Sequence, residues 1–477
     1  MGQEIDNTRF QQNDFDRFEE RLDLETRLLC NLMNKKVFSD RHPVAGFEIE
    51  AWLLYQDMSP APVNKAYLEK LQDPLASPEL AKFNIELNNT PRVLAGNAFS
   101  QLHRDLDDIW QRATAAAEGM DTRLLMIGIL PTLDQSALNL GNMSDLNRYR
   151  ALNEQFLQLR GKPIHLDIVG REHLHIDHHN VMLESATTSF QIHMQVPLDL
   201  AHIYYNTSLI ASAAIVAVSA NSPFLFGVDL WDETRIPVFE QSIETGGFNG
   251  AASGPVRRVS FGSGYIRHGI IECFEENLQH FPIMLPMAFD APPEAFRHLR
   301  LHNGTIWRWN RPLIGFDEDG TPHLRIEHRT PAAGPTIIDS VANAAFYYGL
   351  TQNLCEEMVK SGNLIPFSLA RDNFYQAARL GMNALTTWRN GEKVRLRSIM
   401  LSEFIPRATL GLKSLGVSRC DIEDYLGIIQ RRIETGQNGC AWQRSFMEQD
   451  ASTMTNMTST YLIHQKSGKP VSEWALC

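Results

Sequence analysis

Four short segments of the 477-residue sequence alternate apolar residues with carboxylate, amide, imidazole or guanidinium side chains. Their polar members are Glu48 and Glu50; Asn84, Glu86 and Asn88; Gln191, His193 and Gln195; and Arg325, Glu327 and Arg329. Because successive side chains of a strand point to opposite faces, each set would lie on one face. A half-exposed antiparallel sheet gives the same alternation without any chemistry. A site is favoured because lysine is absent from these faces, and because carboxylates as close as Glu48 and Glu50 repel each other unless a cation lies between them.

If the four faces belong to one sheet, they offer a cation carboxylate oxygens, amides and one imidazole. Oxygen-rich sites suit Mg²⁺ or Mn²⁺, and these ions commonly bridge phosphate groups. Arg329 would share a face with Glu327 and present a planar, positively charged fork to a phosphate. The common alternatives are missing, since the sequence contains no GxxxxGK(S/T) loop, no complete GxGxxG fingerprint, no HExxH and no GxSxG. We therefore expect an ATP site built on metal ions and arginines.

A histidine-rich stretch, residues 165–179, is a second candidate site. His173 and His175 could share a strand face and bind a transition metal. An exposed polar excursion, or a mobile loop near an active site, explains the same residues without a metal, because no cysteine or second fixed pair completes a recognised spacing. The sequence leaves open the role of this stretch and of residues 420–477.

The elements that must position these side chains mix strands and helices. Strands are predicted over residues 46–54, 83–88, 124–129, 189–196 and 324–329. Helices are predicted over residues 12–34, 98–118, 145–160 and 209–220, and almost throughout the chain after residue 338, including 340–360, 371–388 and 419–434. A segment rich in Gly, Ser and Pro, residues 245–264, is expected to form a flexible loop over a site. This order predicts the α+β class, and we expect one large catalytic domain over residues 1–477, with a core at about 44–385 and a helical C-terminal extension at about 386–477.

Composition limits the classes of function. The chain has 44 Lys and Arg against 56 Asp and Glu, a net charge of −12, which disfavours a non-specific binder of nucleic acid or anionic membranes. Its six cysteines include no CxxC pair, which excludes a zinc ribbon and a dense disulfide framework. The N-terminal residues are acidic where a signal peptide needs a basic and then an apolar stretch. The most apolar run, 209–218, is far short of the ~20 residues that span a bilayer. We expect a soluble, cytoplasmic protein.

The polar strands and several further motifs resemble, in order, those of the glutamate–cysteine ligase family, carboxylate–amine ligases related to glutamine synthetase. The similar segments are 46–50 (G-x-E-x-E), 86–91 (a second acidic strand ending in Thr-Pro), 147–149 (an R-Y helix), 185–195 (S-T-A-x-x-Q-V-x), 219–229 (S-A-x-S-P-F-x-x-G-x-D), 309–312 (W-x-x-R-P with one residue fewer), 327–329 (E-x-R) and 373–381 (N-x-x-x-A-x-R-x-G). The resemblance runs from about residue 44 to 385. The histidine-rich stretch and residues 420–477 lie outside it.

The resemblance implies a fold, a reaction and a set of roles. The fold would be an antiparallel sheet that forms a glutamine synthetase-like catalytic half-barrel flanked by helices. ATP would phosphorylate the γ-carboxylate of glutamate, and an amine, most commonly cysteine, would attack the acyl phosphate to form an amide. The implied metal ligands are Glu48, Glu50, Glu86, His193 and Glu327; the nucleotide contacts are Arg311, Arg329, Gln191 and Asn88; the substrate contacts are Arg235, Arg258 and Tyr265; and the catalytic residues are Glu50, Glu327, Arg329 and Arg235.

Other interpretations stay open at this point. The acceptor could be another amine, since no residue can be identified as recognising a thiol. A metal-dependent hydrolase could use the same carboxylates together with the histidine-rich stretch. A non-catalytic binder of nucleotide or metabolite is disfavoured, because it has little need of so many like charges. Structural ion pairs would also account for Arg235, Arg258 and Arg311. The expected partners are glutamate, an amine such as cysteine, and ATP with Mg²⁺ or Mn²⁺, with no nucleic acid and no membrane; a homo-oligomer is left open.

Overall fold

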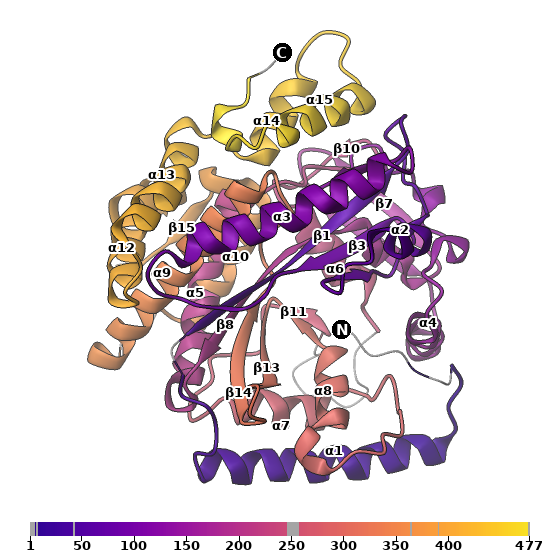
Figure 1. Cartoon of the computed structure of the whole chain (residues 1–477), viewed down its shortest axis with the longest axis vertical. Coiled ribbons are helices and arrows are strands. Elements are labelled where there is room, and N and C mark those ends of the chain that lie inside the picture. The colour runs from indigo at the N-terminus through magenta and orange to yellow at the C-terminus, as the bar shows by residue number, and fades with distance from the viewer. Residues whose placement is uncertain are drawn as a thin grey trace.

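A curled antiparallel sheet lies at the centre of the computed structural model, which describes residue 5 and residues 8–41, 43–245, 257–362, 365–389 and 391–475 (Figure 1). The main path of the sheet runs β13–β14–β8–β1–β3–β2, and β4 and β5 also pair with β1. The strands are β1 (Val44–Leu54), β2 (Ala76–Pro78), β3 (Asn84–Asn88), β4 (Arg92–Val93), β5 (Arg123–Leu125), β8 (Phe190–Val196), β13 (Asn310–Phe316) and β14 (Pro322–His328). The expected α+β class and antiparallel half-barrel are confirmed.

Helices cover one face of this sheet. The apolar residues of β1 that alternate with its glutamates, among them Phe47, Ile49 and Ala51, are buried on that side. Behind the strands lie α5 (Ala201–Ser219) and α9 (Ile337–Ser361), which contact each other and the sheet. The Tyr348 hydroxyl of α9 donates a hydrogen bond of 2.7 Å to the carbonyl of His193 on β8. The helices thus fix the backbone from behind and leave the polar face of the strands free for a site.

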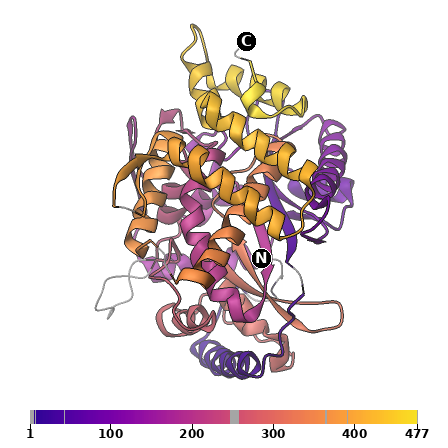
Figure 2. The ribbon, with the colours of Figure 1, turned by 90° about the vertical axis from the view of Figure 1, so that its left-hand side faces the viewer.

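The remaining elements surround this core. The other α-helices are α1 (Gln12–Asn34), α2 (Asn64–Leu71), α3 (Ala98–Glu118), α4 (Asn147–Arg160), α6 (Arg235–Ser242), α7 (Ile271–His280), α8 (Arg297–Gly304), α10 (Phe367–Leu380), α11 (Leu396–Ile399), α12 (Ile405–Ser414), α13 (Arg419–Thr435), α14 (Gly439–Met447) and α15 (Met454–Lys466). Four two-stranded sheets pair β6 (Ile164–Val169) with β7 (His173–His178), β9 (Phe224–Leu225) with β10 (Val228–Asp229), β11 (Val259–Ser260) with β12 (Trp307–Arg308), and β15 (Leu385–Thr387) with β16 (Lys393–Arg395). Figures 1 and 2 both place α1 at the opposite end of the molecule from α14 and α15.

The apolar run that was expected at 209–218 belongs to a longer helix. Leu198–Ser219 is long and apolar enough to cross a membrane by length and composition. However, 89% of its apolar window is buried inside the protein, where α9 and α10 pack against it. We therefore interpret it as a core helix. The sequence-based start at residue 209 was wrong because the polar residues of its first two turns, such as Asn206 and Ser208, are buried through hydrogen bonds within the core.

Three other sequence-based boundaries need correction. The strand predicted over 124–129 is only Arg123–Leu125. The helix predicted over 371–388 ends at Leu380, and Leu385–Thr387 pairs as strand β15 with Lys393–Arg395 of β16 instead. Gly381 explains this end, because its φ is +55° and a Cβ there would lie 2.1 Å from the Asp232 carboxylate. Of the predicted loop 245–264, residues 246–256 lie outside the described residues, and Val259–Ser260 form β11.

Candidate active site

The four polar strand faces lie side by side on the central sheet. Glu327 of β14 is directly opposite His193 of β8, and Glu48 of β1 is opposite both Gln191 of β8 and Asn88 of β3. Glu50 is opposite Glu86. Directly opposite residues in a sheet share a face, so the predicted carboxylates, the imidazole and the amides stand together on the face away from α5 and α9.

At one end of this face each carboxylate contacts a basic side chain; we call this set the paired group (Glu48, Glu327, His193, Arg311 and Arg329). Arg311 Nη2 lies 3.0 and 2.9 Å from the two carboxylate oxygens of Glu327, and Arg329 Nη1 donates to Oε1 of the same carboxylate. All three side chains are buried. Burial alone would raise the pKa of Glu327, but the two guanidinium groups hold that pKa well below its usual range.

The second carboxylate of the paired group is held by an imidazole. His193 Nε2 lies 3.0 Å from Glu48 Oε1. Burial opposes ionisation of Glu48, yet this contact lowers its pKa to about 2. Neither ring nitrogen of His193 has a well-aligned hydrogen bond in the described part of the chain, although the side chain is buried. A cation between the imidazole and the carboxylate would satisfy both.

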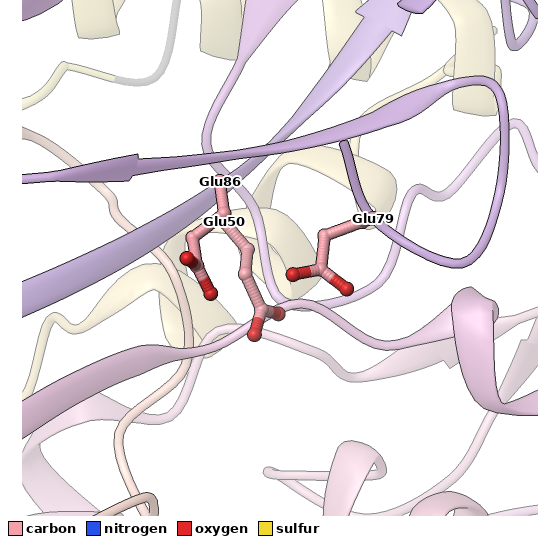
Figure 3. A group of neighbouring side chains, drawn as sticks. All are labelled: Glu50, Glu79 and Glu86. Carbon is pink, nitrogen blue, oxygen red and sulfur yellow. The ribbon is translucent and has the colours of Figure 1, made fainter. Parts of the chain in front are cut away.

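At the other end of the same face, three carboxylates gather that form no ion pair with another described residue; we call Glu50, Glu79 and Glu86 the acidic group (Figure 3). One carboxylate oxygen from each lies within 4.8 Å of the other two. Burial raises the pKa of all three, and for Glu79 the charges of Glu86 and Glu50 raise the pKa further. Among the residues that the structure describes, only this group brings three ligand atoms of His, Cys, Asp or Glu so close together. Such a set fits a divalent cation that prefers oxygen ligands.

Hydrogen bonds orient the acidic group. Glu50 accepts bonds from the Ser189 backbone nitrogen at 2.6 Å and from the Ser189 hydroxyl at 2.9 Å. The Asn88 amide donates to Glu86 over 2.9 Å. Gln191 joins the two ends of the face, because its Nε2 donates to Glu50 while its Oε1 accepts from Arg329. Asn88 and Gln191 thus lie in the site, while their predicted nucleotide contacts stay a prediction.

Sequence reasoning missed two carboxylates of this region. Glu79 follows β2 in the turn that leads to β3, where no period of two could reveal it. The R-Y helix supports that turn, since the Tyr149 hydroxyl donates to the Pro78 carbonyl at 3.3 Å and accepts from Arg148 at 2.9 Å. Glu184 lies in a 3₁₀-helix, Val181–Ala186. Burial, together with the charge of Glu50, raises the pKa of Glu184 to about 8.

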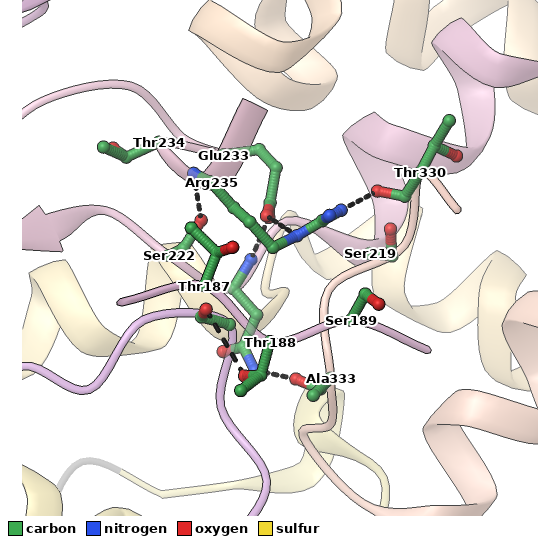
Figure 4. A network of polar contacts seen from close by, with 12 residues as sticks. Thr187, Thr188, Ser189, Ser219, Ser222, Glu233, Thr234, Arg235, Thr330 and Ala333 are labelled. Atoms are coloured by element: carbon green, nitrogen blue, oxygen red, sulfur yellow. Dashed lines mark hydrogen bonds and ion pairs between the residues drawn. The ribbon is translucent and has the colours of Figure 1, made fainter. Parts of the chain in front are cut away.

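Arg235 of α6 directs its guanidinium group towards Thr330, which follows β14 in the chain (Figure 4). Its Nε donates to Glu233 at 3.0 Å, and its two terminal nitrogens donate to the carbonyls of Arg329 and Thr330. The side chain is buried, and burial lowers the pKa of its guanidinium. These contacts hold the backbone that follows Glu327. Its predicted contact with a substrate carboxylate stays a prediction.

Residues 420–477, whose role the sequence left open, support this part of the site. The Asn221 backbone nitrogen donates to Glu233 at 2.9 Å, and the Asn221 side-chain amide donates to the Tyr461 hydroxyl of α15 at 2.8 Å. Gln443 of α14 donates to the Asn221 side-chain oxygen at 2.9 Å. A buried polar chain therefore connects α14 and α15 through Asn221 and Glu233 to Arg235.

The other two predicted substrate residues lie around β11. Arg258 is buried and donates to the carbonyls of Thr305 and Pro282, and no carboxylate in the described part of the chain is within ion-pair distance of it. Burial lowers the pKa of Arg258 to about 9. Tyr265 packs edge-on against Phe367, and burial raises the pKa of its hydroxyl. The structure does not join either side chain to the paired or acidic group, and their substrate contacts stay predictions.

The histidine-rich stretch forms the β6–β7 hairpin, on which His165, His173 and His175 are exposed. His173 and His175 share its exposed face, as expected, with ring centres 6.4 Å apart. His173 is paired with Asp167 at 2.7 Å and His165 with Asp177. These pairs lie on the hairpin itself, so the described residues give the carboxylates of the sheet no histidine from this stretch. That arrangement disfavours the hydrolase that would combine the two.

The paired and acidic groups together suit a polyanionic ligand. Cations held by the acidic group and by Glu48 and His193 would add to the positive charge of Arg311 and Arg329. Phosphoryl transfer depends on such charge neutralisation and positioning more than on a nucleophilic side chain. The geometry can therefore hold a phosphate chain and a second substrate on one sheet face.

Comparison with known proteins adds an independent finding. The sequence model of glutamate-cysteine ligase family 2 (GCS2) matches residues 44–459. A crystal structure of glutamate–cysteine ligase from Francisella tularensis, solved in complex with AMP, is similar in fold, with 11% identity and a TM-score of 0.54 over 92% of this chain and 91% of that chain. The bifunctional glutathione synthetase of Pasteurella multocida is similar over 95% of this chain and 55% of that chain, at 10% identity and a TM-score of 0.49. The ligase PafA, in its complex with the prokaryotic ubiquitin-like protein Pup, is similar over 89% and 72%, at 11% identity and a TM-score of 0.39. No curated protein matches the sequence.

Proposed function

The chain belongs to glutamate-cysteine ligase family 2, and from this premise we propose that it is an ATP-dependent ligase that joins the γ-carboxylate of glutamate to an amine. The observation that carries the proposal is the single sheet face on which the paired group and the acidic group lie side by side. A ligase of this kind must bring a carboxylate and a triphosphate together although both are anions. Buried arginines and clustered metal ligands are the means that proteins use for this.

The residues fit divalent cations on two observations. The acidic group has three ligand oxygens within 4.8 Å of one another, and no Lys, Arg or His of the described residues forms an ion pair with them. The ring nitrogens of His193 are buried beside Glu48 without aligned hydrogen bonds. We therefore propose that Glu50, Glu79 and Glu86 hold one ion, and that Glu48, His193 and Glu327 hold a second. Mg²⁺ or Mn²⁺, when bound there, would neutralise phosphate charge.

The arginines of the paired group would bind the phosphates of ATP. Arg311 and Arg329 both contact Glu327, which keeps their guanidinium groups fixed on the site face. Fixed donors lose little entropy when a phosphate binds, and a guanidinium can contact two phosphate oxygens at once. Gln191, which touches Glu50 and Arg329, would keep the metal ligands and the phosphate contacts in register.

In the proposed reaction, a γ-carboxylate oxygen of glutamate attacks the γ-phosphorus of ATP, and the bond from that phosphorus to the β–γ bridging oxygen breaks to release ADP. The amine then attacks the acyl carbon, inorganic phosphate leaves, and the amine loses a proton to give the amide. Arg329 neutralises the transferring phosphoryl group, and Arg235 orients the glutamate carboxylates from the strand end. Cysteine is the acceptor that the family name indicates, and we propose it as the first acceptor to test.

We also propose that residues 1–477 act as one catalytic domain. The family match extends to residue 459, beyond the motifs that end at Gly381. The polar chain from Tyr461 and Gln443 through Asn221 to Arg235 supports this, because it ties the C-terminal helices to a site residue.

The test is product identification. The purified protein is incubated with ATP, Mg²⁺, glutamate and a mixture of amines that includes cysteine, and ADP release and new γ-glutamyl products are measured by mass spectrometry. We expect stoichiometric ADP and one dominant amide. Glu69→Gln, a change at an exposed acid of α2, is the control for acidic-residue substitution. Binding of ATP without ADP release in any mixture would overturn the proposal.

A further inference from the structure

A buried carboxylate near the site has no described partner of opposite charge. Glu240, on α6, is 7% exposed. Its Oε1 accepts hydrogen bonds from the Trp309 indole nitrogen at 2.8 Å and from the Tyr375 hydroxyl at 2.7 Å. Across the described residues, no Lys, Arg or His nitrogen lies within ion-pair distance of it. Arg257 is the nearest cation that influences it, and Arg257 itself contacts Glu244 at 3.8 Å.

The sheet register places this carboxylate next to the site face. Arg311 is directly opposite Glu327, and the Arg329 backbone nitrogen donates to the Trp309 carbonyl at 2.9 Å, which continues the same ladder. Trp309 therefore stands opposite Arg329 on the face that carries the paired group. The Arg235 guanidinium lies over the Trp309 ring, 5.4 Å from its centre. The indole nitrogen on the edge of that ring donates a hydrogen bond to Glu240. One aromatic ring therefore separates Glu240 from the arginines of the site.

Glu240 lacks a partner that fully compensates its charge. A carboxylate that is removed from water is costly unless a cation or several donors compensate it. Two neutral donors on one oxygen compensate Glu240 only in part, and burial raises its pKa to about 7. Tyr375 is half-buried and Glu240 keeps some exposure, so the carboxylate is not sealed inside the core.

We propose that Glu240, framed by Trp309 and Tyr375, binds the ammonium group of the acceptor amine. The inference rests on the proposed function, because it assigns the second substrate of that reaction to a subsite beside Arg329. It also gives a chemical class for the acceptor: an amine that is positively charged when it binds and that gives one proton to the Glu240 carboxylate before its nitrogen attacks the acyl carbon. A neutral nucleophile has no use for this subsite, since it cannot pair with the carboxylate.

The alternative is that Glu240 only supports Trp309 and Tyr375. Glu240→Gln separates the two roles, because the glutamine carbonyl can still accept both hydrogen bonds while the charge is lost. The assay measures ATP- and glutamate-dependent ADP release with three acceptors. L-Cysteine and ethylamine carry an ammonium group at neutral pH, whereas hydroxylamine is uncharged and reacts with an acyl phosphate without an ammonium subsite. Glu244→Gln, in the neighbouring acid, is the matched control.

We expect Glu240→Gln to raise KM for L-cysteine and ethylamine about 10- to 100-fold, the effect of losing a buried charged contact, and to leave the hydroxylamine rate within about twofold of wild type. Glu240→Asp keeps the charge on a shorter side chain, so its KM values for L-cysteine and ethylamine should lie between those of wild type and Glu240→Gln. Glu244→Gln should leave all three rates within about twofold. If Glu240→Gln fails to fold, as its melting temperature would show, the KM values of Glu240→Asp decide the question in the same way.

The outcomes separate the two proposals. Unchanged KM for both ammonium acceptors in Glu240→Gln overturns the inference and leaves the ligase intact. An equal loss of activity with all three acceptors in Glu240→Gln would assign Glu240 a supporting role and would also overturn the inference. A wild-type protein that forms hydroxamate but uses neither L-cysteine nor ethylamine also contradicts it. A wild-type protein that releases no ADP with any acceptor removes the proposed function, and the inference with it.

Discussion

The paired and acidic groups share one sheet face, yet the pKa values of their carboxylates shift in opposite directions. In the paired group, Glu327 contacts two guanidinium groups and Glu48 contacts an imidazole, so their pKa values fall despite burial. In the acidic group, burial raises the pKa values of all three carboxylates, and neighbouring carboxylates raise those of Glu79 and Glu86 further. The protein has already balanced the charge at one end and has left it unbalanced at the other. A metal ion bound by this protein would therefore contribute most to stability at the acidic group.

The largest effect is expected for Glu327→Gln in the paired group. The change leaves Arg311 and Arg329 buried without their carboxylate, which should lower the free energy of unfolding by about 3–5 kcal/mol. Loss of the preorganised charge should also reduce kcat by about 100- to 1000-fold. Urea unfolding of the metal-free protein and steady-state kinetics measure the two effects. A rate and stability close to those of Glu69→Gln would contradict the assigned role.

Glu86→Gln in the acidic group should separate activity from stability. We expect kcat to fall about 100-fold, because a metal ligand is lost. The metal-free protein should be as stable as wild type or more stable, because a like charge is removed from beside Glu50 and Glu79. The same unfolding measurement checks this. If Glu86→Gln destabilised the metal-free protein as much as Glu327→Gln does, the distinction between the two groups would not hold.

Metal addition should stabilise the protein through the acidic group. After chelation, Mg²⁺ or Mn²⁺ at 100 times its dissociation constant should raise the free energy of unfolding by about 2.7 kcal/mol. The gain should be smaller at about pH 6 than at about pH 8, because protons compete with the ion for carboxylates whose pKa values are raised. Calorimetry with and without metal measures it. Glu86→Gln should lose most of this gain, and an equal gain in that variant would place the ion elsewhere.

The last effect concerns pH in the metal-free protein. The folded pKa of Glu184 is about 8, against an ordinary value of 4.5. The folded state therefore holds the proton more tightly than the unfolded state, so the stabilising contribution is complete below about pH 4.5 and is lost as the pH rises through about 8. The stability difference between wild type and Glu184→Gln should decline over this range. Glu48, whose pKa is lowered, should show the reverse: its contribution exists above pH 4.5 and is lost as the pH falls towards about 2.

Much of the fold and part of the site could be predicted from the sequence. The period of two in the segments around Glu48, Glu86, His193 and Glu327 placed their polar side chains on strand faces, because β-geometry alone requires it. No local pattern in the sequence showed that these strands are neighbours in the sheet. The order of the motifs, through their resemblance to a family, gave that expectation, and the sheet topology and the family match support it.

The rest depends on contacts between distant segments. Glu79 lies in a turn and Glu184 in a 3₁₀-helix, so no periodicity marks either as a member of the site. The helical spacing of residues 371–388 continues past Gly381, but the helix ends at Leu380, and the φ of +55° at Gly381 is not helical. Glu240 lies outside every motif, and its burial needs Trp309 and Tyr375 from two other elements.

The contacts of Gln443 and Tyr461 with Asn221 have a consequence for how the protein is made. A ribosome adds α14 and α15 after every strand of the central sheet, and segments that emerge early begin to fold first. The nascent chain can therefore present all the carboxylates of the site before the support behind Arg235 exists. We expect activity to arise only once α15 has left the exit tunnel, so that unfinished chains do not consume ATP during synthesis.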